Sequence, residues 1–290
     1  MPGLSDASIA LNAPDLERLA LLLYPEAMRI GVAQTSPLFG ERAANTRRAL
    51  ELLSSEAANL WVLPEFFATG YQFTSKDEAR ALAELIPDGP TTAALASFCR
   101  DQSCFVAAGL PEISGDRQFN ASVLVGPDGF IASYRKIHLF GDESLYFDFG
   151  DRPFEVADIG PARVGMMICF DHLFPESARS LSLLGADVIV HPANLILPDL
   201  AQRTMTIRAL ENGVFTATAN RVGEEARSDT VLHYTGQSQI ISPRGEILAR
   251  LSPDREEIAV VEIDPTSARS KRITSRNDKH ADRRPDLYRL

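Results

Sequence analysis

Four short apolar segments each lead into a polar or reactive side chain: residues 60–63 into Glu65, 131–134 into Lys136, 164–168 into Cys169, and 188–190 into His191 and Asn194. In open α/β sheets, sites form where strands end and loops begin, because the rigid sheet directs side chains into a shared crevice. A carboxylate, an ammonium group and a thiol at three such ends are the groups that thiol-based acyl transfer requires.

Taken singly, each of these residues has an ordinary structural explanation. A cysteine at the end of an apolar strand is most often buried and inert. Lys136 would by default be solvated, and Glu65 would be a helix cap or half of a surface ion pair. The two phenylalanines that follow Glu65 instead favour a desolvated carboxylate with a raised pKa, as a general base needs.

In combination, the three segments resemble the motifs of the nitrilase superfamily of carbon–nitrogen hydrolases. Residues 63–71 (LPEFFATGY) resemble its glutamate motif, 134–140 (YRKIHLF) its lysine motif and 167–176 (MICFDHLFPE) its cysteine motif. The order Glu65, Lys136, Cys169, with gaps of 71 and 33 residues, also fits. The resemblance continues through residues 191–194, 208–212 and 283–288, and it covers the chain from about Met28 to the C-terminus.

The resemblance implies an α/β fold in which two mixed sheets lie between two layers of helices, an αββα four-layer sandwich. It also implies a homodimer or higher homo-oligomer, in which subunits pair through their helical faces and the C-terminal tail reaches over the partner. The chemistry it implies needs no metal and no organic cofactor.

The roles implied for the motif residues follow ordinary thiol chemistry. A free cysteine has a pKa of ~8.5, so little of it is thiolate at neutral pH. Glu65 would take the proton of Cys169, and the charge of Lys136 would favour the thiolate. Lys136 and the backbone N–H of Phe170 would stabilise the oxyanion, where one good donor is worth ~3–4 kcal/mol.

A second carboxylate, Glu143, follows Lys136 by seven residues. By resemblance, and in preference to the adjacent Asp142, it is expected to hold the substrate nitrogen or to position water. Tyr71, Phe170 and Asn194 are expected to bind substrate.

The residues after the cysteine bear on the substrate. Members that cleave nitriles often have Trp-Glu-Asn there, whereas this chain has Phe170-Asp171-His172. The expected activity is therefore hydrolysis of a small amide or an N-carbamoyl compound to a carboxylic acid and ammonia, with a small aliphatic nitrile as the alternative substrate. Arg203 and Arg208 are the arginines that could hold a substrate carboxylate.

Two functions of other classes remain as alternatives. A metal-dependent hydrolase has little support, because the five histidines show no His-Glu-x-x-His spacing and the cysteines no Cys-x-x-Cys spacing. His172 and His191 are expected to support the core or the site instead. A non-catalytic binding subunit is disfavoured because Glu65, Lys136 and Cys169 are all present.

The elements that must position these residues alternate between strands and helices, with hairpins between them. Strands are expected at residues 28–34, 60–63, 105–110, 121–125, 131–134, 163–169, 187–191, 214–219, 237–242, 247–250 and 257–263. Helices are expected at residues 43–58, 79–85, 91–99, 176–184 and 200–212. Such alternation with hairpins predicts a layered fold with a mixed sheet. No break in composition suggests a linker, so residues 28–290, including the tail 266–290, are expected to form one domain after an extension, 1–27, that carries a short helix at Asp15–Leu23.

The overall composition is that of a folded protein with an acidic surface. The chain has 290 residues, 45% of them hydrophobic, and a formal net charge of −10. That charge disfavours nucleic-acid binding, which needs clustered Lys and Arg. The basic tail is expected to pack on its own or a partner subunit. Three cysteines suggest a reducing compartment, and the longest early apolar run, Leu19–Tyr24, is far too short to span a bilayer. A cytoplasmic protein without membrane association is therefore predicted.

Overall fold

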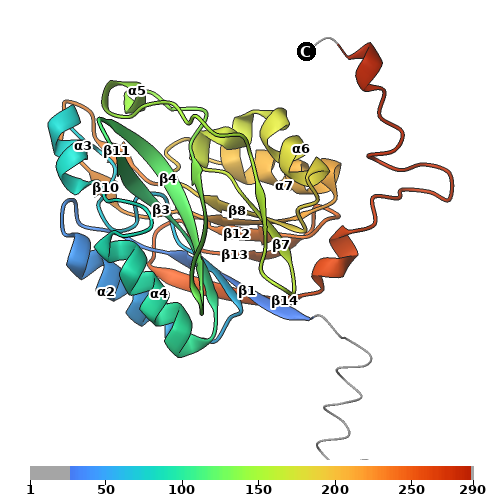
Figure 1. Cartoon of the computed structure of the whole chain (residues 1–290), viewed down its shortest axis with the longest axis horizontal. Coiled ribbons are helices and arrows are strands. Elements are labelled where there is room, and N and C mark those ends of the chain that lie inside the picture. Colours follow the sequence, from blue (N-terminus) through green and yellow to red (C-terminus); the bar gives the residue numbers. More distant parts are fainter. Residues whose placement is uncertain (1–26, 289–290) are drawn as a thin grey trace, which may run out of the picture.

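Two six-stranded mixed sheets make up the centre of the protein (Figure 1). The computed structural model describes residues 27–288, so the helix expected at Asp15–Leu23 lies outside the described part. The first sheet has the order β14 (Glu257–Ile263), β1 (Met28–Gln34), β2 (Leu60–Val62), β3 (Phe105–Ser114), β4 (Arg117–Gly126) and β5 (Gly129–Arg135). The second has the order β13 (Ile247–Arg250), β12 (Gln239–Ile241), β9 (Phe215–Ala219), β8 (Val188–Pro192), β7 (Arg163–Met166) and β6 (Val156–Asp158).

In each sheet, three central strands run parallel to one another, and every other pair of neighbouring strands is antiparallel. The parallel strands are β1–β2–β3 in the first sheet and β7–β8–β9 in the second. Helices α2 (Arg42–Leu53) and α4 (Pro90–Gln102) cover the outer face of the first sheet, and α6 (Pro175–Leu183) and α7 (Leu200–Asn212) cover the second. The expected αββα sandwich is therefore confirmed.

The alternation of side chains along β1 shows how the layers form. Ile30 and Val32 point into the core between the sheets, whereas Ala33 points to the core under α2 and α4. Gly31 faces the same outer side, where a Cβ atom would lie 2.3 Å from the ring of Trp61. A residue larger than glycine there would displace that buried tryptophan, because the interior is close-packed.

Several expected boundaries change in the structure. β1, α7, β13 and β14 begin and end where the sequence predicts. The hairpin of β3 and β4 is longer than expected, because Pro111 continues the ladder opposite Asn120. β7 ends at Met166 instead of Cys169, and a 3₁₀ turn, η1 (Cys169–Leu173), begins at the cysteine.

Shorter elements complete the described chain. They are α3 (Lys76–Leu82), α5 (Glu143–Tyr146), the two-stranded ribbon of β10 (Glu224–Glu225) and β11 (Leu232–His233), η2 (Pro265–Ala268) and η3 (Pro285–Leu287). Among the helices of residues 27–288, none is long and apolar enough to cross a membrane.

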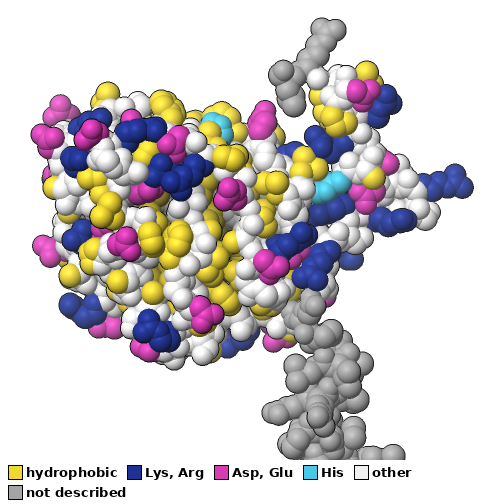
Figure 2. Space-filling model, in the orientation of Figure 1, with side chains coloured by type: hydrophobic (Ala, Val, Ile, Leu, Met, Phe, Trp, Pro, Cys, Tyr) yellow, Lys and Arg dark blue, Asp and Glu magenta, His cyan; other side chains and the backbone are white. Residues whose placement is uncertain are grey.

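The C-terminal tail first contacts its own subunit and then projects from it (Figure 1). Lys271 Nζ donates to the carbonyl of Gly213 at 2.8 Å, and His280 Nε2 lies 3.0 Å from Ser182 Oγ. Basic side chains gather along the tail in the space-filling view (Figure 2).

Candidate active site

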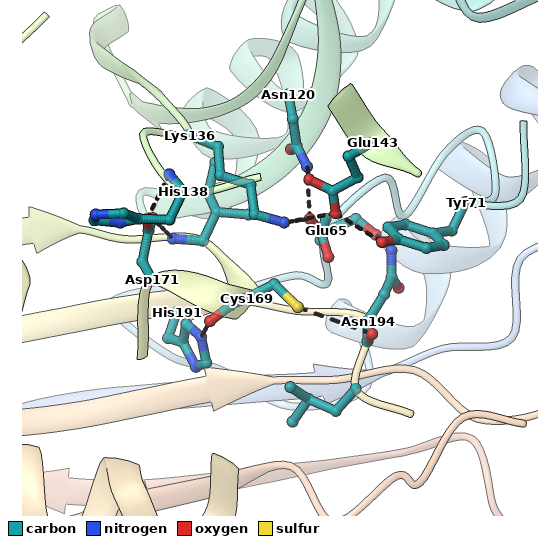
Figure 3. A network of polar contacts seen from close by, with 12 residues as sticks. Glu65, Tyr71, Asn120, Lys136, His138, Glu143, Cys169, Asp171, His191 and Asn194 are labelled. Atoms are coloured by element: carbon teal, nitrogen blue, oxygen red, sulfur yellow. Dashed lines mark hydrogen bonds and ion pairs between the residues drawn. The ribbon is translucent and has the colours of Figure 1, made fainter. Parts of the chain in front are cut away.

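Four charged or reactive side chains meet in the interior, between the two sheets (Figure 3). Glu65 follows β2, Lys136 follows β5, Glu143 begins α5, and Cys169 begins η1. All four are buried. Lys136 Nζ donates to Glu65 Oε1 at 2.8 Å and to Glu143 Oε1 at 2.7 Å. The structure therefore brings together residues that lie up to 104 positions apart, from Glu65 to Cys169.

Burial and charge set the protonation of this group. Burial raises the pKa of the Glu65 carboxyl; the positive charge of Lys136 acts against this rise, and the negative charge of Glu143 adds to it. Burial also works to lower the pKa of Lys136, but the two carboxylates outweigh it and hold that pKa above its usual range. Lys136 is therefore an ammonium group that already has two anionic partners.

The thiol of Cys169 is held protonated. Burial raises its pKa well above the usual range, the charge of Glu65 raises it further, and Lys136 only partly opposes them. Lys136 thus acts in the direction expected from the sequence, but desolvation is the larger effect. A thiolate can form at neutral pH only if a nearby base accepts the proton, and Glu65 Oε2 has no hydrogen-bond partner in the described structure.

Two residues in this region have left-handed backbone. Cys169 has φ 41° and Phe66, directly after Glu65, has φ 51°, a region that non-glycine residues rarely adopt. Such strain clusters at functional sites, where surrounding contacts enforce it. Close packing enforces it beside Glu65, since a Cβ atom on Gly109 would lie 2.5 Å from Glu65 Cα.

The turn that carries Cys169 is held at its N-terminal end by hydrogen bonds from two sides. Buried Asp171 accepts from the N–H of Ile168 and from the hydroxyl of Tyr134, each at 2.8 Å. His191 Nε2 donates to the carbonyl of Cys169 at 2.9 Å, and burial lowers the pKa of His191 to about 3, so the ring is neutral. Within residues 27–288, no group of three or more His, Cys, Asp or Glu side chains is arranged to hold a metal ion.

Of the three side chains expected to bind substrate, Tyr71 and Asn194 contact the two glutamates and Phe170 lines a pocket. The Tyr71 hydroxyl donates to Glu143 Oε1 at 2.7 Å, and Asn194 Nδ2 donates to the carbonyl of Glu65 at 2.9 Å. Both therefore position the glutamates. Phe170 lines a pocket beside Cys169.

Asn120 is a site residue that sequence reasoning missed. It lies inside β4, and its Nδ2 donates to Glu65 Oε1 at 2.6 Å and lies 3.5 Å from Glu143 Oε2. A signal was present, since Asn120 is polar and directly precedes the apolar run 121–125.

Glu225 of β10 was also missed, and it holds the loop that carries Tyr71. Its buried carboxylate accepts from the backbone N–H groups of Tyr71, at 3.1 Å, and Gln72, at 2.6 Å. Arg221 NH1 donates to the same carboxylate. No local pattern marks Glu225 as different from the neighbouring Glu224, which is exposed.

The suggested role of Arg203 and Arg208 in holding a substrate carboxylate is wrong for this structure. The Arg208 guanidinium donates hydrogen bonds to the carbonyls of His172 and Leu173 and to the carboxylate of Glu211. Arg203 is largely exposed, 3.7 Å from Asp199. Neither arginine lines the cavities at Cys169 or Glu143.

Two adjoining cavities reach the buried group. The cysteine pocket has a volume of about 30 Å³ and is lined by Phe140, Cys169, Phe170, His172, Asn194, Leu195, Ile196, Leu197, Leu200 and Ala201. The outer cavity has about 200 Å³ and is lined by Tyr71, Gln72, Phe73, Phe140, Gly141, Asp142, Glu143, Tyr146, Phe147, Ile196, Ser228, Thr230 and Leu232. A larger hollow of about 530 Å³ between α2 and α4 is not lined by Glu65, Glu143 or Cys169, so size alone does not identify the site.

Comparison with known proteins gives relatives that include carbon–nitrogen hydrolases, nitrilases and amidases. Residues 29–273 match the family model described as carbon-nitrogen hydrolase. A nitrilase from Pyrococcus abyssi is 47% identical, with 90% of this chain and 99% of the relative covered. An (R)-stereoselective amidase from Pseudomonas sp. is 34% identical, with 82% and 85% covered. A solved amidase variant from Nesterenkonia sp. AN1, with acrylamide added at its active-site cysteine, aligns with a TM-score of 0.71 at 25% identity, covering 81% of this chain and 93% of that one.

Proposed function

Because this chain belongs to the carbon–nitrogen hydrolase family of the nitrilase superfamily, we propose that it hydrolyses a small amide or N-carbamoyl compound through a thioester on Cys169. An amide would yield a carboxylic acid and ammonia. One observation carries the proposal: buried Cys169 faces a buried ammonium group that is shared by two carboxylates, one of which has an unpartnered oxygen. The names of the amidase relatives support an amide as the substrate.

In the first half of the reaction, Glu65 accepts the thiol proton and the sulfur of Cys169 attacks the amide carbon. Negative charge then develops on the carbonyl oxygen. Lys136 and the backbone N–H of Phe170 stabilise that charge in a site where little water competes. Glu65 returns the proton to the nitrogen, the carbon–nitrogen bond breaks, and ammonia leaves a thioester on Cys169.

In the second half, water attacks the thioester carbon. Glu65 takes a proton from the water and passes it to the sulfur as the carbon–sulfur bond breaks, which gives the acid and the Cys169 thiol. Glu143 is held by Lys136 and Tyr71, and it positions the substrate nitrogen or the incoming water.

A nitrile is the second candidate substrate, and the Pyrococcus abyssi nitrilase supports it. The test is ammonia release from hexanamide, hexanenitrile and N-carbamoyl butylamine under identical conditions. The proposal expects kcat/KM for one of the two carbonyl compounds to exceed that for the nitrile. Faster turnover of the nitrile would reverse the order of the candidates, and turnover of none would contradict the proposed function.

Lys136 should be indispensable for the rate. Lys136→Ala removes an oxyanion donor, and we expect kcat to fall by about 10²–10³-fold. It also leaves two buried carboxylates without their cation, which should cost about 3–5 kcal/mol of unfolding free energy. Lys136→Arg should not restore activity, because a planar guanidinium cannot replace a compact ammonium group in a closed site.

Thermal unfolding measured beside kcat separates the two effects of Lys136. A Lys136→Arg protein that is folded but inactive fits the expected role. A Lys136→Arg protein with near-normal kcat would contradict it.

We also propose that the protein forms a homodimer through α6 and α7. Four large apolar side chains on or beside these helices are exposed: Leu183, Leu184, Ile207 and Leu210. The projecting tail next to them offers a second contact surface. Light scattering after size-exclusion chromatography should give twice the chain mass of 31.7 kDa, and a monomer at micromolar concentration would contradict the dimer.

Free thiols support a cytoplasmic location. Cys99, Cys104 and Cys169 are all buried and unpaired, as is usual in a reducing compartment. Intact mass after purification without reductant should show three free thiols, and a disulfide would count against this location.

A further inference from the structure

We propose that the outer cavity holds the part of the substrate beyond its amide group and selects neutral or cationic chains over chains that end in a carboxylate. The placement rests on the proposed amide hydrolysis, which puts the scissile amide between Cys169 and Glu143. Its grounds are the sizes of the two adjoining cavities and the charges of the side chains that line them.

The cysteine pocket is too small for more than the reacting group. Its volume of about 30 Å³ leaves room for roughly two water-sized groups. The outer cavity, at about 200 Å³, begins at Phe140 and Ile196, which line both spaces. A chain attached to the amide can therefore pass these two side chains and continue into the outer cavity, which has the room that the cysteine pocket lacks.

The lining offers nothing that would hold an anionic end group. No Lys or Arg lines either cavity in the described part of the chain. His172 lines the cysteine pocket, but burial and the charge of Arg208 lower its pKa to about 4, so it is neutral at pH 7. Lys136 is fully buried and already paired with Glu65 and Glu143.

Arg227, next to the lining residue Ser228, is also occupied. Its guanidinium donates to Glu78 at 2.6 and 2.9 Å and to the carbonyl of Gln72 at 2.9 Å. A substrate carboxylate would have to displace Glu78 to use it.

The carboxylate of Asp142 makes the outer cavity favour a cationic end group over an anionic one. Its exposed side chain lines the cavity and makes no hydrogen bond or ion pair with any other residue of 27–288. A distal ammonium group would find this carboxylate unpaired, whereas a distal carboxylate would meet a like charge with no compensating cation. The only other carboxylate in the described lining, Glu143, is already paired with Lys136. The remaining polar side chains of the lining are neutral: Tyr71, Gln72, Tyr146, Ser228 and Thr230.

The experiment compares three amides of matched length: hexanamide, 5-aminopentanamide and adipamate, in which four methylene groups separate the amide from a methyl, an ammonium or a carboxylate group. At low ionic strength, kcat/KM for 5-aminopentanamide should exceed that for adipamate by about tenfold or more, because the difference is one reversal of charge beside Asp142. Added salt should reduce the ratio, since Asp142 is exposed.

Two substitutions of Asp142 test the cause. Asp142→Asn, which preserves shape, should reduce the ratio by about threefold or more, and Asp142→Lys should bring it to one or below. The ratio within each variant is the readout, so a general loss of activity cancels. Asp128→Lys is the matched control, because it makes the same change of charge at an exposed position in the turn before β5. The seven residues of β5 separate Asp128 from Lys136, which places the two about 20 Å apart. This variant should leave the ratio within about twofold of wild type, because exposed charges that far apart are screened.

The outcomes separate this proposal from the function on which it rests. If hexanamide and both charged amides are inert, the proposed amide hydrolysis fails. If hexanamide is hydrolysed but adipamate equals or exceeds 5-aminopentanamide, amide hydrolysis stands and the charge selection is overturned. A wild-type preference for 5-aminopentanamide that is the same in both Asp142 variants would also overturn it.

Discussion

Cys169→Ala should abolish turnover, with a fall in kcat on the order of 10⁵-fold, because no other group in the site can form the thioester. Cys169→Ser should be nearly as inactive, since a hydroxyl is a far weaker acid than a thiol and Glu65 is placed to deprotonate a thiol. Ammonia release from the best amide of the panel measures both variants. Incubation of wild type with that amide, followed by acid quenching and intact-mass analysis, should show an acyl group on Cys169.

The other two cysteines supply matched controls. Cys99 and Cys104 are buried at the end of α4 and directly before β3, under the outer helical layer. Cys99→Ala and Cys104→Ala should each keep kcat within a few-fold of wild type while losing a little unfolding free energy. Equal loss of activity in all three variants, with folding intact, would exclude Cys169 as the specific nucleophile.

Glu65→Gln should slow both the alkylation of Cys169 by iodoacetamide and the release of ammonia. The buried thiol has a raised pKa and needs a base near neutral pH, and general-base assistance is worth about 10²–10⁴-fold. Because burial raises the pKa of Glu65, wild-type rates should fall on acidification at a pH above the usual range for a glutamate. In Glu65→Gln this acid limb should disappear, and alkylation should recover only at alkaline pH.

Glu143→Gln is the matched comparison and should act in a different way. The amide oxygen can still accept hydrogen bonds from Lys136 and Tyr71, so the geometry is kept. The negative charge of Glu143 raises the pKa of both Glu65 and Cys169. Its removal should therefore move the acid limb of alkylation to lower pH, while amide turnover falls and an acyl-enzyme can accumulate.

Alkylation rate, ammonia release and intact mass of both glutamate variants decide between the two assignments. Loss of alkylation in Glu143→Gln, together with normal alkylation in Glu65→Gln, would show that the base and the positioning residue have been exchanged.

The sequence by itself determined the elements whose signals are local. The apolar run Met28–Gln34, bounded by Ser36-Pro37, gives β1, and α7 ends where Gly213 adopts the left-handed conformation with φ 60°. Composition and periodicity gave only a layered fold with a mixed sheet. The four-layer sandwich was expected only from the resemblance of the three motifs to those of the nitrilase superfamily. The motifs could be found in the sequence because each one is a contiguous strand end with its following loop.

The tertiary structure decided which groups touch and how they are charged. Asn120 of β4 and Glu225 of β10 belong to the site because both strands, although distant in sequence, lie beside residues 65–72, which include Glu65 and Tyr71. Arg208, suggested as a residue that holds a substrate carboxylate, instead donates hydrogen bonds to two backbone carbonyls. The balance at Cys169 could not be read from residue types, because Lys136 favours the thiolate while burial opposes it more strongly. Desolvation depends on what the two sheets and their loops exclude from the interior, and that is a property of the packed layers as a whole.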